Sequence, residues 1–230
     1  MLSVFDILPI SDILGEHMAD LRIDIISDLV CPWCYLGYSR LKQAIEQLGD
    51  DYRIDIRWQP FELHPDMPLT GADRETYLGE RFGSPEKLNE ATHAIQQVGI
   101  EANIQFNFSE KDRIPNTKLA HQFVLAATQS GLATPFVLAL FHAYFTDGKD
   151  IGLQATLEEV ATSIGMQKVD IDYALSSKAK TLTEKKLEHL RGLNIQSVPT
   201  YVINDKYMIQ GAHDPESFLK VLNDIAEKEL

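Results

Sequence analysis

The chain contains two cysteines, Cys31 and Cys34, and their i, i+3 spacing is the feature of the sequence that most directly implies chemistry. Two cysteines scattered at random over a chain of this length fall at this spacing in roughly 1% of cases. At the N-terminus of a helix, unpaired backbone N–H groups and the helix dipole stabilise a thiolate. Cys31 is then the expected nucleophile towards a disulfide, and Cys34, three residues later, resolves the mixed disulfide that forms.

Two other interpretations of this pair stay open. The cysteines are also compatible with two buried small hydrophobic residues, or with half of a zinc site completed by two of the seven histidines. A disulfide-rich scaffold and a four-cysteine zinc site are excluded by the cysteine count.

The segments around the cysteines predict a strand, a turn and a helix. Residues 22–26 form a β-branched run, and apolar residues recur at helical spacing after Cys34. Pro32 suits the first position of a helix, where its missing N–H is not needed, and this places Cys31 at the helix N-terminus. Residues 52–59 alternate between apolar and polar and predict a second strand, so the segment reads as a βαβ unit with parallel strands.

The C-terminal segment returns to strands. Residues 200–203 and 207–209 flank a turn at Asn204 and Asp205, which predicts an antiparallel hairpin. Asp214 is the expected cap of a last helix, with Pro215 at its first position.

Between these two parts, from about residue 73 to residue 190, the pattern is almost wholly helical. Asn116 is the expected N-cap of the helix that follows Pro115. Thr156 and Glu159 have capping-box spacing and predict the start of another helix.

Charge and hydropathy limit the partners and the location. The 230 residues include 21 basic and 34 acidic ones, a net charge of −13, so we expect neither nucleic acid nor an anionic membrane surface as a partner. No apolar run is long enough to span a bilayer. Residues 1–20 are expected to form an N-terminal extension, and residues 2–10 lack the basic start of an export signal, so the expected location is the cytoplasm.

Three groups of residues carry a family resemblance: Cys-Pro-Trp-Cys-Tyr-Leu-Gly at 31–37, Pro-Asn-Thr at 115–117 with Ala-His at 120–121, and Ser-Val-Pro-Thr at 197–200 with Gly-Ala at 211–212. In this order and spacing they resemble the FrnE-like branch of the DsbA family. The resemblance implies an α/β thioredoxin-like fold, with a βαβ half at residues 21–66 and a ββα half at residues 187–230. A large all-helical insertion at residues 67–186 would interrupt the fold.

The resemblance also assigns roles to individual residues. It implies that Cys31 is the nucleophile, Cys34 the resolving thiol, and Pro199 the proline of a cis peptide that faces Cys31. The residues expected to contact substrate or tune the motif are Pro32, Trp33, Val198, Asn116 and Thr117.

Several polar residues have a structural and a functional interpretation. Asn116 and Thr117 are first explained as a helix cap, and His121 as a structural histidine on a helix. Asp24 is either a proton acceptor for the second cysteine or a solvated carboxylate at a strand edge. Asp28 would raise the pKa of the cysteines if it faced them.

Three classes of function compete. The leading hypothesis is a dithiol-disulfide oxidoreductase that acts on thiols or disulfides of proteins or small molecules, with no cofactor and with glutathione as a candidate co-substrate. The alternative enzyme is a glutathione-dependent isomerase or transferase that resembles 2-hydroxychromene-2-carboxylate isomerases and kappa-class transferases, which typically carry serine at the Cys31 position and do not need Cys34. The third class is a non-enzymatic metal- or partner-binding module. Reduction potential, substrate and oligomeric state do not follow from the sequence.

Overall fold

The computed structural model describes residues 19–49, 52–108, 112–193 and 195–229. The predicted extension therefore lies, up to residue 18, outside the described residues. Strand β1 (Ala19–Ser27) lies at the centre of a four-stranded sheet, parallel to β2 (Tyr52–Pro60) and antiparallel to β5 (Thr200–Ile203). The order of this sheet is β2-β1-β5-β6, with β6 (Tyr207–Gln210) antiparallel to β5.

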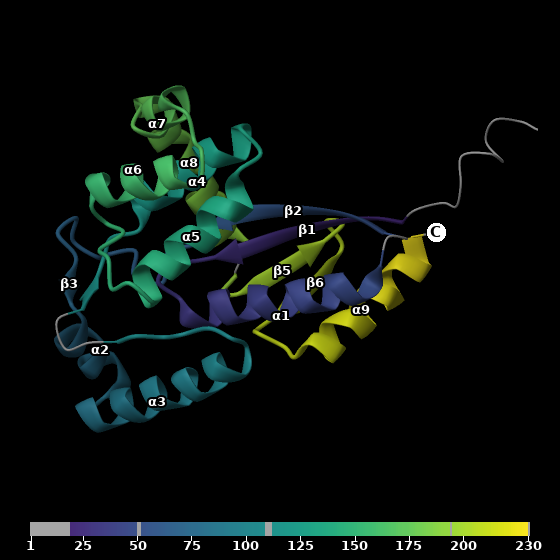
Figure 1. Cartoon of the computed structure of the whole chain (residues 1–230), viewed down its shortest axis with the longest axis horizontal. Helices are drawn as coiled ribbons and strands as arrows, with labels where there is room; N and C mark the ends of the chain where they lie inside the picture. The colour runs from purple at the N-terminus through teal and green to yellow at the C-terminus, as the bar shows by residue number, and fades with distance from the viewer. Residues whose placement is uncertain (1–18, 50–51, 109–111, 194, 230) are drawn as a thin grey trace, which may run out of the picture.

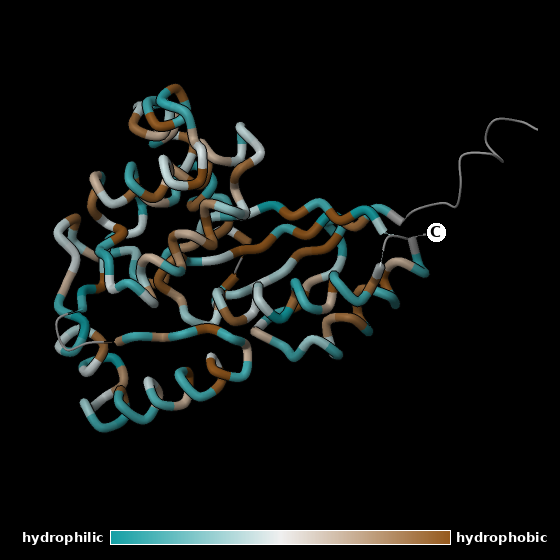
Figure 2. The backbone as a smooth tube through the Cα atoms, in the orientation of Figure 1, coloured by the Kyte–Doolittle hydropathy of each residue, from teal (hydrophilic) through white to brown (hydrophobic). Residues whose placement is uncertain are grey.

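Helices α1 (Pro32–Leu48) and α9 (Pro215–Glu229) lie side by side on one face of the sheet (Figure 1). Alternation along β1 accounts for this, because Leu21, Ile23 and Ile25 are buried and belong to the same core as residues of both helices. On the other face, Ile26 packs in a smaller cluster with Leu190 of the helical region. Figure 2 shows hydrophobic positions along the central strands, separated by hydrophilic ones.

The insertion between β2 and β5 is mainly helical. It contains α2 (Arg74–Phe82), α3 (Pro85–Glu101), α4 (Lys118–Gln129), α5 (Ala133–Phe145), α6 (Gln154–Ser163), α7 (Lys168–Ala174) and α8 (Ser177–Gly192). It also contains a short antiparallel pair, β3 (Ala72–Asp73) and β4 (Arg113–Ile114), which the sequence did not predict because two-residue strands show no periodicity. No described helix is long and apolar enough to cross a membrane.

The predicted α/β thioredoxin-like fold with a helical insertion is confirmed, and the local signals at its C-terminal end are borne out. Asn204 and Asp205 have φ of 51° and 57°, as the predicted hairpin turn requires, and Asn204 Oδ1 accepts the Arg22 N–H at 2.8 Å. Asp214 Oδ1 accepts the Ser217 N–H at 2.8 Å and so caps α9.

Two predicted helix starts are wrong by one or more residues. Helix α4 begins at Lys118 with Thr117 as its N-cap; Asn116, one residue earlier, still contributes because its Oδ1 accepts the Lys118 N–H at 3.0 Å. Helix α6 begins at Gln154, so Thr156 lies inside its first turn and does not cap it. A capping-box spacing inside a helix satisfies the sequence pattern equally well, which explains this error.

Candidate active site

The two cysteines lie at the start of helix α1, just after the turn that follows strand β1. Cys31 is the N-cap of α1 and Pro32 occupies its first turn, as predicted. The Cys34 N–H donates to the Cys31 carbonyl at 3.0 Å, which closes this turn. Both thiols are free, and Cys31 is 4% exposed whereas Cys34 is fully buried. The pair therefore has an outer thiol at the helix N-terminus and an inner thiol behind it.

The loop before β5 brings a second segment to the outer thiol. The Val198–Pro199 peptide is cis, as the resemblance implied, and Cys31 Sγ lies 3.8 Å from the Val198 carbonyl oxygen. The Gly211 N–H donates to the Pro199 carbonyl at 2.8 Å, and Thr200 Oγ1 donates to the Ser197 carbonyl at 2.8 Å. These hydrogen bonds fix the shape of the loop, and its Val198 carbonyl meets Cys31 across a sequence separation of 167 residues.

A cavity of about 380 Å³, which we call the front cavity, opens beside Cys31. Pro32, Trp33 and Val198 line it, and Trp33 is 44% exposed at its rim. Its other walls are largely apolar side chains from α2 and α3. The ionisable groups among its described lining residues, besides Cys31, are His64, Arg74, Arg81 and Tyr144, and none of them is a carboxylate. In a chain of net charge −13, this is a locally basic cavity.

Burial raises the pKa of the Cys34 thiol well above its usual value, and the neighbouring Cys31 thiol raises it further. Two groups act in the opposite direction and lower the pKa of Cys34: the Ser27 hydroxyl and the backbone of Asp28. The Asp28 carboxylate contacts other groups, because its Oδ2 accepts the Leu63 N–H at 2.7 Å and its Oδ1 lies 3.7 Å from His121 Nε2.

The burial and the raised pKa of the Cys34 thiol predict that it resists alkylation at neutral pH. A raised pKa leaves little thiolate at neutral pH, and the thiolate fraction grows as the pH approaches that pKa. Iodoacetamide should therefore label Cys31 first, and Cys34 only in alkaline or denaturing solution. Mass spectrometry of the labelled peptide as a function of pH measures this order. Equal labelling rates for the two thiols at neutral pH would contradict it.

Sequence analysis did not identify Glu62, a buried carboxylate in the loop after β2. Burial raises its pKa, while Lys118, His121 and Arg191 act to lower it, and Arg191 Nη2 donates to Glu62 Oε2 at 2.6 Å. The sequence carries no signal for this group, because its partners come from α4 and α8. Glu62 therefore links the insertion to the end of β2.

The remaining candidates lie away from the thiols or have structural partners. Asn116 and Thr117 are buried and do not line the front cavity; Asn116 Nδ2 donates to the Met67 carbonyl at 2.7 Å. His121 is buried, and its Nε2 lies 2.9 Å from the Phe61 carbonyl oxygen, which agrees with the structural interpretation. Asp24 accepts hydrogen bonds from Arg22 and Gln59. The structure thus brings together Cys31, Cys34, Pro32, Trp33, Val198 and Pro199.

A metal site is not formed by the part of the chain that the structure describes, where no three His, Cys, Asp or Glu side chains cluster suitably. The arrangement of a free thiol at a helix N-terminus, a second thiol behind it and an adjoining cavity is suited to thiol-disulfide exchange.

Comparison with known proteins places this geometry in a family. The model of the DSBA-like thioredoxin domain matches residues 22–223. The chain is 27% identical over 209 residues to the uncharacterized protein YwbO of Bacillus subtilis (strain 168), covering 90% of this chain and 98% of that protein.

Two solved structures show the same fold. The probable DsbA oxidoreductase SCO1869 from Streptomyces coelicolor superposes with a TM-score of 0.83 at 21% identity, covering 91% of each chain. The cytosolic disulfide reductase DsbM from Pseudomonas aeruginosa, solved with GSH, gives a TM-score of 0.63 at 15% identity, covering 90% of this chain and 99% of that one. Because the family model spans nearly the whole described chain, the protein belongs to the family of DSBA-like thioredoxin domains.

Proposed function

We propose that the protein is a dithiol-disulfide oxidoreductase in which Cys31 is the nucleophile and Cys34 the resolving thiol. The observation that carries the proposal is the free Cys31 thiol at the N-terminus of α1, beside the front cavity and 3.8 Å from the Val198 carbonyl oxygen. In this proposal Pro199 belongs to the loop that carries this carbonyl, and the backbone of Val198 pairs with an extended substrate chain.

The exchange has two balanced steps. The Cys31 thiolate attacks one sulfur of a substrate disulfide, so that a mixed disulfide forms and the other substrate sulfur leaves as a thiolate. Cys34 then attacks the Cys31 sulfur, which releases the second substrate thiolate and leaves a Cys31–Cys34 disulfide. The substrate gains two electrons and the enzyme loses two; the reverse sequence oxidises a dithiol substrate. The second thiol favours this reaction over the isomerase alternative, which has no role for it.

Equilibration of the protein with a series of glutathione redox buffers tests the proposal, with thiol labelling to measure the oxidised fraction. A reversible two-electron transition supports a redox enzyme, and its midpoint shows whether the protein reduces or oxidises its substrates. We expect a reducing role in the cytoplasm, the location given for the Pseudomonas reductase. If the two thiols form no disulfide at any ratio of reduced to oxidised glutathione, the proposal is refuted.

The basic front cavity favours anionic disulfides, including glutathione disulfide as co-substrate. Arg81 lines the cavity, is exposed, and stacks on Tyr77 at 3.9 Å. Arg81→Gln is therefore expected to slow the reaction of the reduced enzyme with glutathione disulfide roughly threefold at low salt, and to leave or raise its rate with the cationic disulfide cystamine.

A variant with the same change of net charge at a distant site controls for long-range effects. Arg53 lies at the start of β2, is exposed, and does not line the front cavity. Arg53→Gln should leave the ratio of the two rates unchanged. If Arg81→Gln changes both rates equally, the charge of the front cavity does not select the substrate.

A further inference from the structure

The front cavity contains a guanidinium that has no counter-ion in the described part of the chain. Arg74, the first residue of α2, is partly buried and lines this cavity together with Cys31. None of the ion pairs among the described residues includes Arg74. Burial lowers the pKa of Arg74, and the carboxylates of Asp112 and Glu75 oppose this shift only in part. Because arginine keeps its charge in proteins, the cavity presents a partly buried cation.

Two other residues of the cavity wall fix the position of this guanidinium. Arg74 Cζ lies 4.4 Å from the centroid of the Phe108 ring, and Arg74 Nη2 donates to Thr92 Oγ1 at 3.1 Å. Both Phe108 and Thr92 line the front cavity. The ring contact uses the face of the guanidinium, whereas carboxylates bind to the N–H donors along its edge. Thr92 accepts from one nitrogen only, so Arg74 is held in place with donors left for an anion.

The rest of the front cavity is largely apolar, both at its mouth and inside. Trp33, Leu63 and Phe82 are exposed large apolar side chains, and all three line it. Leu88 and Ile95 of α3 are buried and line it as well. Exposed apolar side chains gathered at one opening mark a binding site, unlike single ones scattered over a surface. The volume of about 380 Å³ falls within the range of small-molecule pockets, roughly 300–1,000 Å³.

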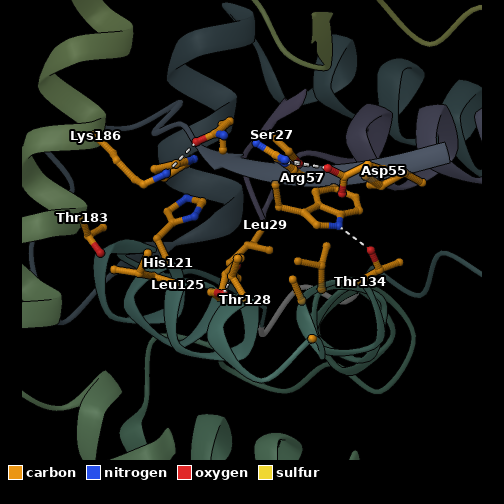
Figure 3. A pocket seen from close by; sticks show the side chains of 18 residues that line it. Ser27, Leu29, Asp55, Arg57, His121, Leu125, Thr128, Thr134, Thr183 and Lys186 are labelled. Atoms are coloured by element: carbon orange, nitrogen blue, oxygen red, sulfur yellow. Dashed lines mark hydrogen bonds and ion pairs between the residues drawn. The ribbon is translucent and has the colours of Figure 1, made fainter. Parts of the chain in front are cut away.

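A second cavity, beside β2, lacks this combination of features (Figure 3). It has a volume of about 550 Å³, and neither cysteine lines it. Its arginine and its lysine already have partners within the protein. Arg57 Nη2 lies 2.7 Å from Asp55 Oδ2, and Lys186 Nζ donates to Gln59 Oε1 at 3.0 Å. A cation that still needs an anion therefore lies beside the reactive thiol and not in this second cavity.

We propose that the front cavity selects disulfides in which the sulfur is attached to an apolar group that carries a carboxylate, and that Arg74 binds this carboxylate. The apolar group packs on the cavity wall, and the sulfur meets the Cys31 thiolate. A Cys31 mixed disulfide then forms, while the other half of the substrate leaves as a thiolate. This inference rests on the proposed function, because it names the substrate class of the same thiol. The exposed Arg81 attracts any anion, whereas Arg74 requires one that enters the cavity.

Two aromatic disulfides that differ in the carboxylate test the role of Arg74. 5,5′-Dithiobis(2-nitrobenzoate) carries a carboxylate on its ring, whereas 4,4′-dithiodipyridine is neutral at neutral pH. Each releases an absorbing product when Cys31 attacks, so stopped-flow absorbance gives both second-order rate constants. We expect Arg74→Gln to lower the ratio of the first rate constant to the second about tenfold. Arg74→Lys keeps the charge but not the planar fork, and its ratio should lie between the two.

A distant variant and added salt separate a direct contact from long-range attraction. Arg53→Gln makes the same change of net charge away from the front cavity, so it should leave the ratio unchanged. At about 1 M salt the Debye length is about 3 Å, so the effect of Arg81→Gln should vanish. The effect of Arg74→Gln should persist, because salt screens a direct contact at a partly buried site much less.

Phe82→Gln tests the apolar part of the proposal. Phe82 is the last residue of α2 and is exposed, so this variant is expected to fold. The comparison substrate is 3,3′-dithiodipropionate, which has carboxylates but no ring, and its reaction is followed by mass spectrometry. We expect Phe82→Gln to lower the rate constant of each aromatic reagent relative to that of dithiodipropionate about threefold. Equal slowing of all three reagents would contradict an apolar contact with the substrate.

The results distinguish a failure of this inference from a failure of the proposed function. An unchanged ratio of the two aromatic rate constants in Arg74→Gln, or an effect that vanishes at high salt, would overturn the inference. The proposed function would be overturned instead if the wild-type protein reacted with all three reagents no faster than free N-acetylcysteine at the same pH. It would also be overturned if no Cys31–Cys34 disulfide followed the reaction.

Discussion

Cys34→Ser is expected to capture a stable mixed disulfide between Cys31 and a substrate, and Cys31→Ser is expected to reduce disulfide exchange to the uncatalysed rate. The asymmetry follows from the geometry. Cys31 lines the front cavity at the helix N-terminus, whereas Cys34 is fully buried behind it and its pKa is raised by burial. Cys34 can reach the Cys31 sulfur but not an external disulfide.

The chain contains two cysteines, so each variant retains a single thiol and any adduct can be assigned to that thiol. After incubation with glutathione disulfide, intact mass spectrometry should show one glutathione adduct on Cys34→Ser and none on Cys31→Ser. Thermal unfolding of both variants serves as the control for folding. Equal residual activity, or equal adduct formation on both variants, would refute the assigned roles.

Short-range features of the fold could be predicted because their signals are local. The spacing of the two cysteines, Pro32 at the helix start, the Asn204–Asp205 turn and the Asp214 cap each specify one conformation over a few residues. The parallel arrangement of β1 and β2 could be predicted from the βαβ connection between them. In the observed register Ile23 pairs with Ile56, and both side chains lie on the same face of the sheet.

Features assembled from distant segments could not be predicted. Glu62 owes its buried environment to Lys118 and Arg191, which lie on two different helices of the insertion. The front cavity exists only where α2 and α3 face the N-terminal end of α1 and the loop at residues 196–198.

One glycine of the cysteine motif has a packing role that the structure explains. Gly37 lies in α1 opposite the segment that follows Pro199, and a Cβ atom at this position would lie 2.3 Å from the Tyr201 hydroxyl oxygen and 3.0 Å from Pro199 Cγ. Tyr201 is fully buried and packs edge-on against Phe218, so its ring has little freedom to move. Gly37 thus allows α1 to approach the loop that faces Cys31.

Gly37→Ala is therefore expected to destabilise the protein by about 1–3 kcal/mol through overpacking, although alanine is the better helix former. Tyr201→Phe should remove most of this cost, because it deletes the obstructing oxygen, and it should itself be neutral or stabilising since that hydroxyl is buried without a partner. Denaturant unfolding of the two single variants and the double variant measures the coupling free energy between the two positions.

Gly79→Ala is the control. Gly79 is also helical, and a Cβ atom there meets nothing within 4 Å, so this change should stabilise the protein by about 1 kcal/mol. The contradicting result is an equal loss of unfolding free energy for Gly37→Ala in the wild type and in the Tyr201→Phe variant. In that case the Tyr201 hydroxyl is not the group that excludes a side chain at position 37.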